Sequence, residues 1–422
     1  RPLLRCAAAW SVPLVIGPPL FSRDAYSYAA QGLMVRQHLD PYTTGPSALG
    51  ASHFLAPVSA IWMHTASPYG PLFLRLSALA VRVSGDSVLA TVLLLRVLEI
   101  AGVVLIAIAL PKLAAAVGKD PARALWLGVC NPLVLFHFIG GAHNDSLMVG
   151  LLVAGLAAAA TRRPMLGVLL CMLGATIKAP AAIVAVFIVV DAVRHVPRDR
   201  RVVTFARLAG VGGGAFLAVS WITGIGWGWI GALGVPGTNR SLLTPTTFVA
   251  HWVSNVVGHD ALVLSATRSA GMLLAVAGVG YLIWRAPHIG MPRACGIALA
   301  LIVALGPIVL PWYALWGMIV LAAAGRRIER GFAIFASVVL LLVVQPSGSA
   351  MPDVVLMCVV VVLSAVALAI AWRPVRRWIR HDLAAAIDRY RGGEIVRLST
   401  AVRSALPDTV LPRTLSVQRD AA

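Results

Sequence analysis

Charged residues are scarce in this chain of 422 residues: only 12% are Asp, Glu, Lys or Arg, whereas an ordinary soluble domain has about 25%. So little charge cannot cover the surface of a soluble protein of this size, which excludes a cytosolic enzyme, a coiled coil and a disordered chain. Hydrophobic residues make up 59% of the sequence. Since one membrane-spanning helix needs roughly 20 apolar residues, this content would supply about twelve helices. The composition predicts an all-α polytopic membrane protein.

Lysine and cysteine are also rare. Only three lysines occur, and most arginines lie in short segments between apolar runs. This distribution is typical of the positive-inside rule and argues against a nucleic-acid partner. The five cysteines are scattered without CxxC or Cys/His spacing, so we expect neither a disulfide framework nor a metal site. The sequence has no nucleotide-binding glycine motif and no Walker motif, so we expect neither ATP nor a nucleotide sugar, and no cofactor.

Apolar runs bounded by charges or helix breakers mark the expected spans. They lie near 6–20, 87–110, 123–139, 146–160, 164–178, 181–195, 203–225, 263–284, 294–310, 313–325, 331–345 and 354–372. Some are shorter than a full span, and we expect the pair around Pro180 to be kinked or re-entrant. The runs predict one transmembrane domain over 1–372. The basic segment 373–422 is expected to be a cytoplasmic, partly disordered tail that interacts with membrane lipids.

The positions of the charges predict the orientation. With the N-terminus inside and alternating helices, 27 of the 35 cations lie on the inner face and five lie in outer segments. This bias predicts a multi-pass plasma-membrane protein with a cytoplasmic tail. Two outer segments, about 21–86 and 226–262, are longer than simple connectors, and loops of that length commonly serve function. Their aromatic residues favour short amphipathic helices on the outer (periplasmic) face, where we expect the active site.

Asp24 directly follows the first apolar run, beside Arg23 and Tyr26. A carboxylate just above the hydrocarbon boundary is well placed to act as a general base on a hydroxyl group. Aspartate is also a favoured N-cap residue, and its position in the sequence does not separate these two roles.

The sequence GGAHND at 140–145 joins two apolar runs on the same face. Its glycines, followed by His143, Asn144 and Asp145, would form a compact polar turn that can hold sugar hydroxyls or a phosphate. Turn formation alone explains Gly, Asn and Asp, but it does not explain His143. Because polar groups at membrane depth are costly, we favour a functional turn.

Further candidate residues lie near other predicted helix ends. Lys178, the only lysine away from the cytoplasmic segments, could neutralise a lipid phosphate or extend to the membrane interface. Arg240 and Arg268 flank the second outer segment and could contact a phosphate or sugar, or serve as interfacial anchors. Trp312 and Tyr313 could stack on a sugar or an isoprenoid chain, or belong to an aromatic belt.

Two ionisable residues fall in the middle of a predicted span. Arg96 and Glu99 are three residues apart and would share one face of a helix. We expect them to pair with each other, which makes them weaker functional candidates than the other intramembrane charges.

Six short motifs occur in a fixed order. They are FSRDAYSY at 21–28, LDPY at 39–42, PYGPL at 68–72, CNPL at 130–133, HND at 143–145 and PWY at 311–313. Over residues 6–372 the sequence resembles the polyprenol-phosphomannose-dependent α-1,6-mannosyltransferases of mycobacteria and related actinobacteria, which are GT-C-type enzymes. That family often has Glu at the position of Asp145, and it has one or two further helices before the first one here.

The resemblance implies a GT-C-like bundle that transfers mannose from polyprenyl phosphomannose to a lipid-anchored α-1,6-mannan acceptor, in lipomannan and lipoarabinomannan synthesis. It implies inversion, with Asp24 as the general base, and a phosphate leaving group that needs cations rather than a general acid. The substrate-binding residues would be Arg23, Tyr26, Tyr69, His143, Asn144, Asp145, Lys178, Arg240, Arg268, Trp312 and Tyr313.

Two alternatives stay open at this point. An arabinofuranosyltransferase that uses polyprenyl phosphoarabinose would have the same architecture, because sequence discriminates poorly between sugar donors. A lipid-carrier flippase belongs to a different class and would have charged pathways through several helices. This sequence instead has sparse intramembrane charge and an acidic residue at the edge of a long outer segment.

Overall fold

The computed structural model describes residues 2–232, 234–235 and 244–343, with 358, 361, 362, 365, 366 and 369. The chain divides into two compact units, Arg1–Val360 and Val361–Ala422. The described residues contain helices and no strands, in agreement with the all-α prediction. The predicted tail at 373–422 and most of the predicted run at 354–372 lie outside the described residues.

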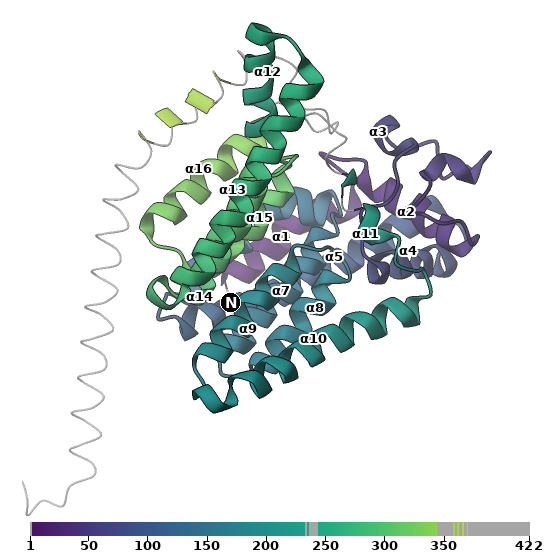
Figure 1. Cartoon of the computed structure of the whole chain (residues 1–422). Helices are drawn as coiled ribbons and strands as arrows, with labels where there is room; N and C mark the ends of the chain where they lie inside the picture. The colour runs from purple at the N-terminus through teal and green to yellow at the C-terminus, as the bar shows by residue number, and fades with distance from the viewer. Residues whose placement is uncertain are drawn as a thin grey trace, which may run out of the picture. The chain divides into compact units, whose positions relative to one another are not determined.

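The helices labelled in Figure 1 belong to the first unit. In chain order the helical elements are α1 (Pro2–Ile16), α2 (Asp24–Arg36), η1 (Pro46–Leu49), α3 (Ala60–Met63), α4 (Pro71–Val83), α5 (Val88–Ala116), α6 (Pro121–Gly128), η2 (Val134–Gly140), α7 (Asp145–Ala160), α8 (Pro164–Ala175), α9 (Ala181–Arg194), η3 (Arg198–Arg200), α10 (Arg201–Thr223), α11 (Trp229–Ala232), α12 (Pro245–Val257), α13 (Asp260–Ile289), α14 (Met291–Leu305), α15 (Pro311–Ala324) and α16 (Arg327–Val343). Every predicted apolar run up to 331–345 overlaps a helix or a pair of helices.

Few of these helices are long enough to cross a membrane alone. By length and composition, α5, the segment Arg198–Thr223 and α13 qualify, and η2 with α7 would form a fourth, broken span bent by 114°. The apolar helices α1, α8, α14 and α15 are shorter. A helix of 12–16 residues is roughly 18–24 Å long, less than the ~30 Å hydrocarbon core. The described residues therefore confirm a helical membrane protein and do not confirm a count of about twelve spans.

The broken span begins at Asn131-Pro132. Proline lacks an N–H and disfavours the preceding helical turn, so α6 ends before it. Asn131 then orders the break, because its Oδ1 accepts the Leu133 N–H at 2.9 Å and its Nδ2 donates to Ser337 Oγ at 2.9 Å. The chain continues as the π-helix η2, a form that is frequent at functional sites.

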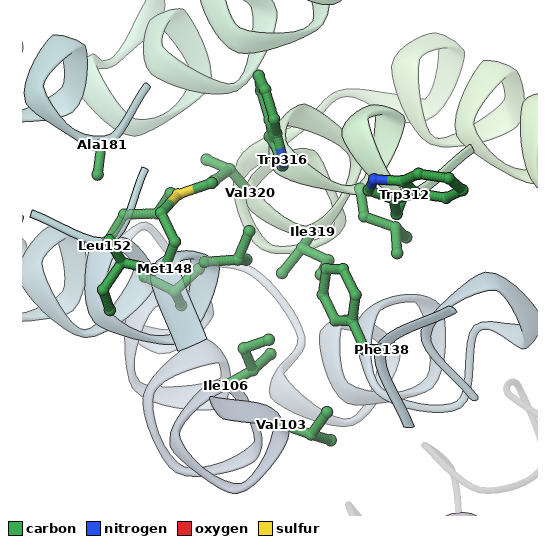
Figure 2. Close-up of a cluster of buried hydrophobic side chains, with 14 of the residues drawn as sticks. Val103, Ile106, Phe138, Met148, Leu152, Ala181, Trp312, Trp316, Ile319 and Val320 are labelled. Carbon is green, nitrogen blue, oxygen red and sulfur yellow. The ribbon is translucent and has the colours of Figure 1, made fainter. Parts of the chain in front are cut away.

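The core lies where α5, η2, α7 and α15 meet (Figure 2). Lipid is as apolar as these side chains, so close packing rather than exclusion of water holds such helices together. The buried side chains that Figure 2 labels are Val103, Ile106, Phe138, Met148, Leu152, Ala181, Trp312, Trp316, Ile319 and Val320. Trp312 and Trp316 lie one turn apart on α15. They connect this core to the polar residues His143 and Asp145.

The predicted outer segment at 21–86 folds into α2, η1, α3 and α4. Helix α2 packs against α4, η1 and α5 and is buried along most of its length. It is therefore covered by protein rather than lying free on a membrane surface. The Arg75 side chain on α4 donates to the Thr223 carbonyl at the end of α10, which joins this segment to the helical bundle.

Gly102 allows α5 and α7 to approach closely. A Cβ atom at residue 102 would lie 2.5 Å from Leu147 N. We therefore predict that Gly102→Ala destabilises the protein by about 1–3 kcal/mol, the usual cost of overpacking. Gly213→Ala on α10 is the control, because an added Cβ there has no neighbour within 4 Å. Thermal unfolding in detergent measures both; equal unfolding temperatures for Gly102→Ala and wild type would contradict the packing.

Candidate active site

Polar side chains from separate segments gather at the end of the bundle where α5 begins and α2 packs. The segments are the start of α2, α3, the turn before α7, the loop between α8 and α9, and the start of α15. α7, α8 and α15 each have one end at this site and extend toward the opposite end of the bundle. Because these helices are short, the site lies within roughly 24 Å of that opposite end. The site is therefore recessed relative to the ends of the long helices.

Asp24 is the first residue of α2 and is only 5% exposed. Its Oδ1 accepts the indole N–H of Trp62 at 2.7 Å, and its Oδ2 lies 3.7 Å from His143 Nε2. Its own N–H donates to Ser22 Oγ at 3.0 Å. Within the described residues, the hydrogen-bond donor to this carboxylate is a side chain of another helix rather than a backbone N–H of α2. The carboxylate is thus directed at the site and does not cap its helix.

The turn at 140–144 is fixed by Gly141 and by His143. A Cβ at Gly141 would lie 2.7 Å from His143 Nδ1 and 2.9 Å from the His137 carbonyl oxygen, so only glycine fits there. His143 Nδ1 is 2.8 Å from that same oxygen. The imidazole stacks on Trp312, with ring centroids 3.7 Å apart and planes inclined by 26°. His143 is fully buried between Asp24 and Trp312.

Asp145 and Lys178 form a buried ion pair. Lys178 Nζ lies 2.9 Å from both oxygens of Asp145, and Trp316 Nε1 donates to Oδ1 at 2.5 Å. Asp145 is fully buried, and Lys178 is 7% exposed. The ammonium group also faces Tyr313, 4.2 Å from its ring centroid, and Tyr69 at 5.5 Å. These contacts hold Lys178 inside the protein.

The expected pairing of Arg96 with Glu99 is wrong. Arg96 instead donates to the carbonyl oxygens of Val15 at 2.5 Å and Gly140 at 3.0 Å, while Glu99 Oε2 accepts the Leu147 N–H at 3.1 Å. Helix ends leave backbone groups without partners, and in an apolar environment each such group is costly. The two side chains therefore satisfy helix ends rather than each other.

The remaining candidates fall in different places. Asn144 is fully buried, and neither polar atom of its side chain has a hydrogen-bond partner among the described residues. Arg23 is exposed and Tyr26 is half-buried. Arg268 on α13 donates to Thr247 Oγ1 of α12 at 3.2 Å. Arg240 lies outside the described residues.

Trp62 and Trp316, which hydrogen-bond Asp24 and Asp145, were not among the predicted site residues. Trp316 had a signal, because it lies four residues after Trp312 and so shares its helix face. Trp62 had none, since only the tertiary fold brings α3 to Asp24. His137 was also missed; it is fully buried, and its ring centroid lies 5.4 Å from that of Trp312. In the part of the chain that the structure describes, no three His, Cys, Asp or Glu residues are placed to hold a metal ion.

These features define a membrane protein whose recessed site combines a carboxylate, a paired lysine and stacked aromatic rings, a set suited to a sugar or phosphate. Family models agree with this class. Residues 1–194 match the N-terminal domain of alpha-(1→6)-mannopyranosyltransferases, and residues 240–373 match the MptB C-terminal domain. The chain belongs to the alpha-(1→6)-mannopyranosyltransferase family and is a glycosyltransferase.

Curated relatives share most of this sequence. Alpha-(1→6)-mannopyranosyltransferase A of Mycobacterium tuberculosis is 35% identical, and the match covers 81% of this chain and 69% of that protein. The enzyme of the same name from Corynebacterium glutamicum is 34% identical, covering 73% and 68%. Alpha-(1→6)-mannopyranosyltransferase B of C. glutamicum is 33% identical, covering 83% of this chain and 63% of that protein. No solved structure matches the chain.

The buried ion pair gives a stability prediction. Lys178→Met leaves the Asp145 carboxylate buried without a cation, so we expect a loss of about 3–5 kcal/mol. Adding Asp145→Asn removes the unpaired charge while keeping an oxygen for Trp316, and should recover much of the loss. Thermal unfolding of the single and double variants measures this. If Lys178→Met unfolds at the wild-type temperature, the pair does not stabilise the fold.

Proposed function

We propose that the protein transfers mannose from polyprenyl phosphomannose to an α-1,6-linked, lipid-anchored mannan acceptor, with inversion and with Asp24 as the general base. The observation that carries this proposal is the Asp24 carboxylate, held by Trp62 and directed into a recessed polar site in a member of a mannosyltransferase family. The products would be the mannan chains of lipomannan and lipoarabinomannan.

The proposed reaction needs one base and one stabilised leaving group. The 6-hydroxyl of the acceptor gives its proton to Asp24 as its oxygen attacks the anomeric carbon of mannose. The bond from that carbon to the phosphate oxygen breaks, and polyprenyl phosphate leaves with the electron pair. Lys178 has three N–H donors and lies beside both Asp145 oxygens, so an N–H remains for the phosphate.

The aromatic rings and Asn144 would bind the sugars. Trp312 and Tyr313 begin α15 beside Lys178 and His143, and Tyr69 faces the same ammonium group. Asn144 offers both a donor and an acceptor to a hydroxyl group. Arg23, Tyr26, Arg240 and Arg268 remain candidate contacts for the mannan or the phosphate.

An apolar groove supports a donor on a lipid carrier. A cavity of about 530 Å³ lies between α1, α5 and η2, and Ser11 is the polar residue among its lining side chains. Val15 and Ile139 are among its lining residues, and Arg96 binds the carbonyl groups of Val15 and Gly140. The groove thus reaches Ile139, the residue before the His143 turn. An isoprenoid chain in the groove would place its phosphate near the site.

We also infer that the site faces the outer side of the plasma membrane and that the tail is cytoplasmic. Lys119, Arg162 and Arg163 follow the ends of α5 and α7 that lie away from Asp24. By the positive-inside rule, cations at that end favour a cytoplasmic location for it, with Asp24 opposite.

Removing the proposed base should stop the transfer of mannose. Asp24→Asn keeps the size of the side chain and an oxygen for Trp62 but cannot take a proton, so we expect a 10²–10⁴-fold loss of rate. Asp40→Asn is the control, because Asp40 is an exposed residue of the same segment whose carboxylate accepts the Tyr42 N–H. Transfer from polyprenyl phosphomannose to a short α-1,6-mannoside measures both. Wild-type activity in Asp24→Asn would refute the assignment.

Filling the groove should weaken use of the lipid donor. Ala8 lines the groove, and its exposed neighbour Ala9 does not. We expect Ala8→Trp to raise the apparent KM for the polyprenyl donor by roughly tenfold, because losing about 1.4 kcal/mol of binding has that effect, with little change in kcat. Ala9→Trp should behave like wild type. Equal donor constants for the two variants would exclude the groove as the isoprenoid site.

A further inference from the structure

We propose that His143 works with Asp24 as a two-residue base: Asp24 takes the proton of the acceptor hydroxyl and passes it to Nε2 of His143. This inference rests on the proposed function, because it assigns a role to a residue behind the proposed base. His143 acts through Asp24 and is therefore a positioning and proton-accepting residue rather than one that contacts substrate.

A hydrogen bond at Nδ1 fixes the tautomer of His143. Its Nδ1 lies 2.8 Å from the His137 carbonyl oxygen. A carbonyl oxygen can only accept a hydrogen bond, so Nδ1 carries the proton of the neutral ring. Nε2 then holds a lone pair, and this atom lies 3.7 Å from Asp24 Oδ2. The nitrogen that can gain a proton is the one that faces the carboxylate.

His143 is buried more deeply than Asp24. The Asp24 side chain is 8% exposed, whereas the His143 side chain is fully buried. A substrate hydroxyl therefore meets Asp24 first, and His143 lies behind it. Trp62 donates to Asp24 Oδ1, and Oδ2 is the oxygen that lies nearer to His143.

Two groups beside His143 offset part of the cost of burying an imidazolium ion at this fully buried position. The Asp24 carboxylate lies on one side of His143, and the Trp312 ring lies across its face with centroids 3.7 Å apart. A carboxylate and an aromatic face both stabilise a cation. The other charged groups near the turn, Asp145 and Lys178, form their own pair, and the His137 ring is 5.7 Å away.

The steps balance without any further reagent. As the acceptor oxygen bonds to the anomeric carbon, its proton moves to Asp24 Oδ2 and the electron pair of the breaking bond leaves with the phosphate. The proton then moves to His143 Nε2, which gives an imidazolium beside a restored carboxylate. After the products leave, the proton returns through Asp24 to water.

Two substitutions at His143 separate this role from anchoring of the turn. His143→Asn places an amide N–H near the position of Nδ1, so it keeps the bond to the His137 carbonyl and has nothing at Nε2. His143→Gln places an amide near Nε2 instead, where it can contact Asp24 but cannot take a proton. We expect both to lower kcat by about ten- to a hundredfold, part of the 10²–10⁴-fold typical of general base catalysis, with nearly unchanged KM values.

The pH profile is the deciding readout. In wild type, the acid limb of kcat should report the coupled Asp24–His143 pair, since a protonated imidazole cannot accept a second proton. In both variants the limb should move, because the imidazole that is coupled to Asp24 in wild type is gone. Thermal unfolding of each variant confirms that it is folded.

The outcomes distinguish the two proposals. A fully active His143→Asn, or a limb that does not move in either folded variant, overturns the role of His143 while leaving Asp24 as the base. If Asp24→Asn is itself fully active, the proposed function of Asp24 fails first, and the inference about His143 fails with it.

Discussion

The site depends on one electrostatic constraint, which is that the charges of Asp145 and Lys178, buried among short apolar helices, must balance each other. The Asp145–Lys178 pair meets this constraint where three parts of the chain come together. Asp145 begins α7, Lys178 lies between α8 and α9, and Trp316 brings α15 to the same carboxylate. Because breaking such a pair costs far more than an exposed salt bridge, it fixes the positions of the helix ends around it. The His143 turn precedes Asp145 directly, so its geometry depends on the same pair.

Broken and short helices explain how a polar site can exist at this depth. α6 ends before Pro132, and the π-helix η2 follows. The chain then bends by 114° between η2 and α7. Each interruption exposes backbone groups, and Arg96 and Glu99 satisfy several of them. The helix ends thereby remain stable away from water, with Asp24, His143, Asp145 and Lys178 close together among them. A sugar on a lipid phosphate could be bound there without any soluble nucleotide-binding domain.

Much of the helical arrangement was predictable from the sequence, because apolar runs and prolines determine where helices begin and end. The clustering of Asp24, His143, Asp145 and Lys178 was partly predictable, since each lies at a helix end on one side of the predicted bundle. The hydrogen-bond or ion-pair partner of each residue was not predictable. Arg96 and Glu99 share a helix face yet bind other helix ends, and Trp62 reaches Asp24 only through the path of 21–86. Which groups pair depends on distances in the folded protein, and the spacing of residues along the sequence does not give these distances.

The most direct test of the account is a donor comparison with purified protein in lipid bilayers. Polyprenyl phosphomannose and polyprenyl phosphoarabinose are offered separately with a short α-1,6-mannoside, and both the glycoside product and the released polyprenyl phosphate are quantified. The account predicts one new α-1,6-mannosyl linkage for each polyprenyl phosphate released from the mannose donor, and no transfer from the arabinose donor. Transfer of arabinose, or movement of the lipid donor across the bilayer with no glycoside formed, would contradict it.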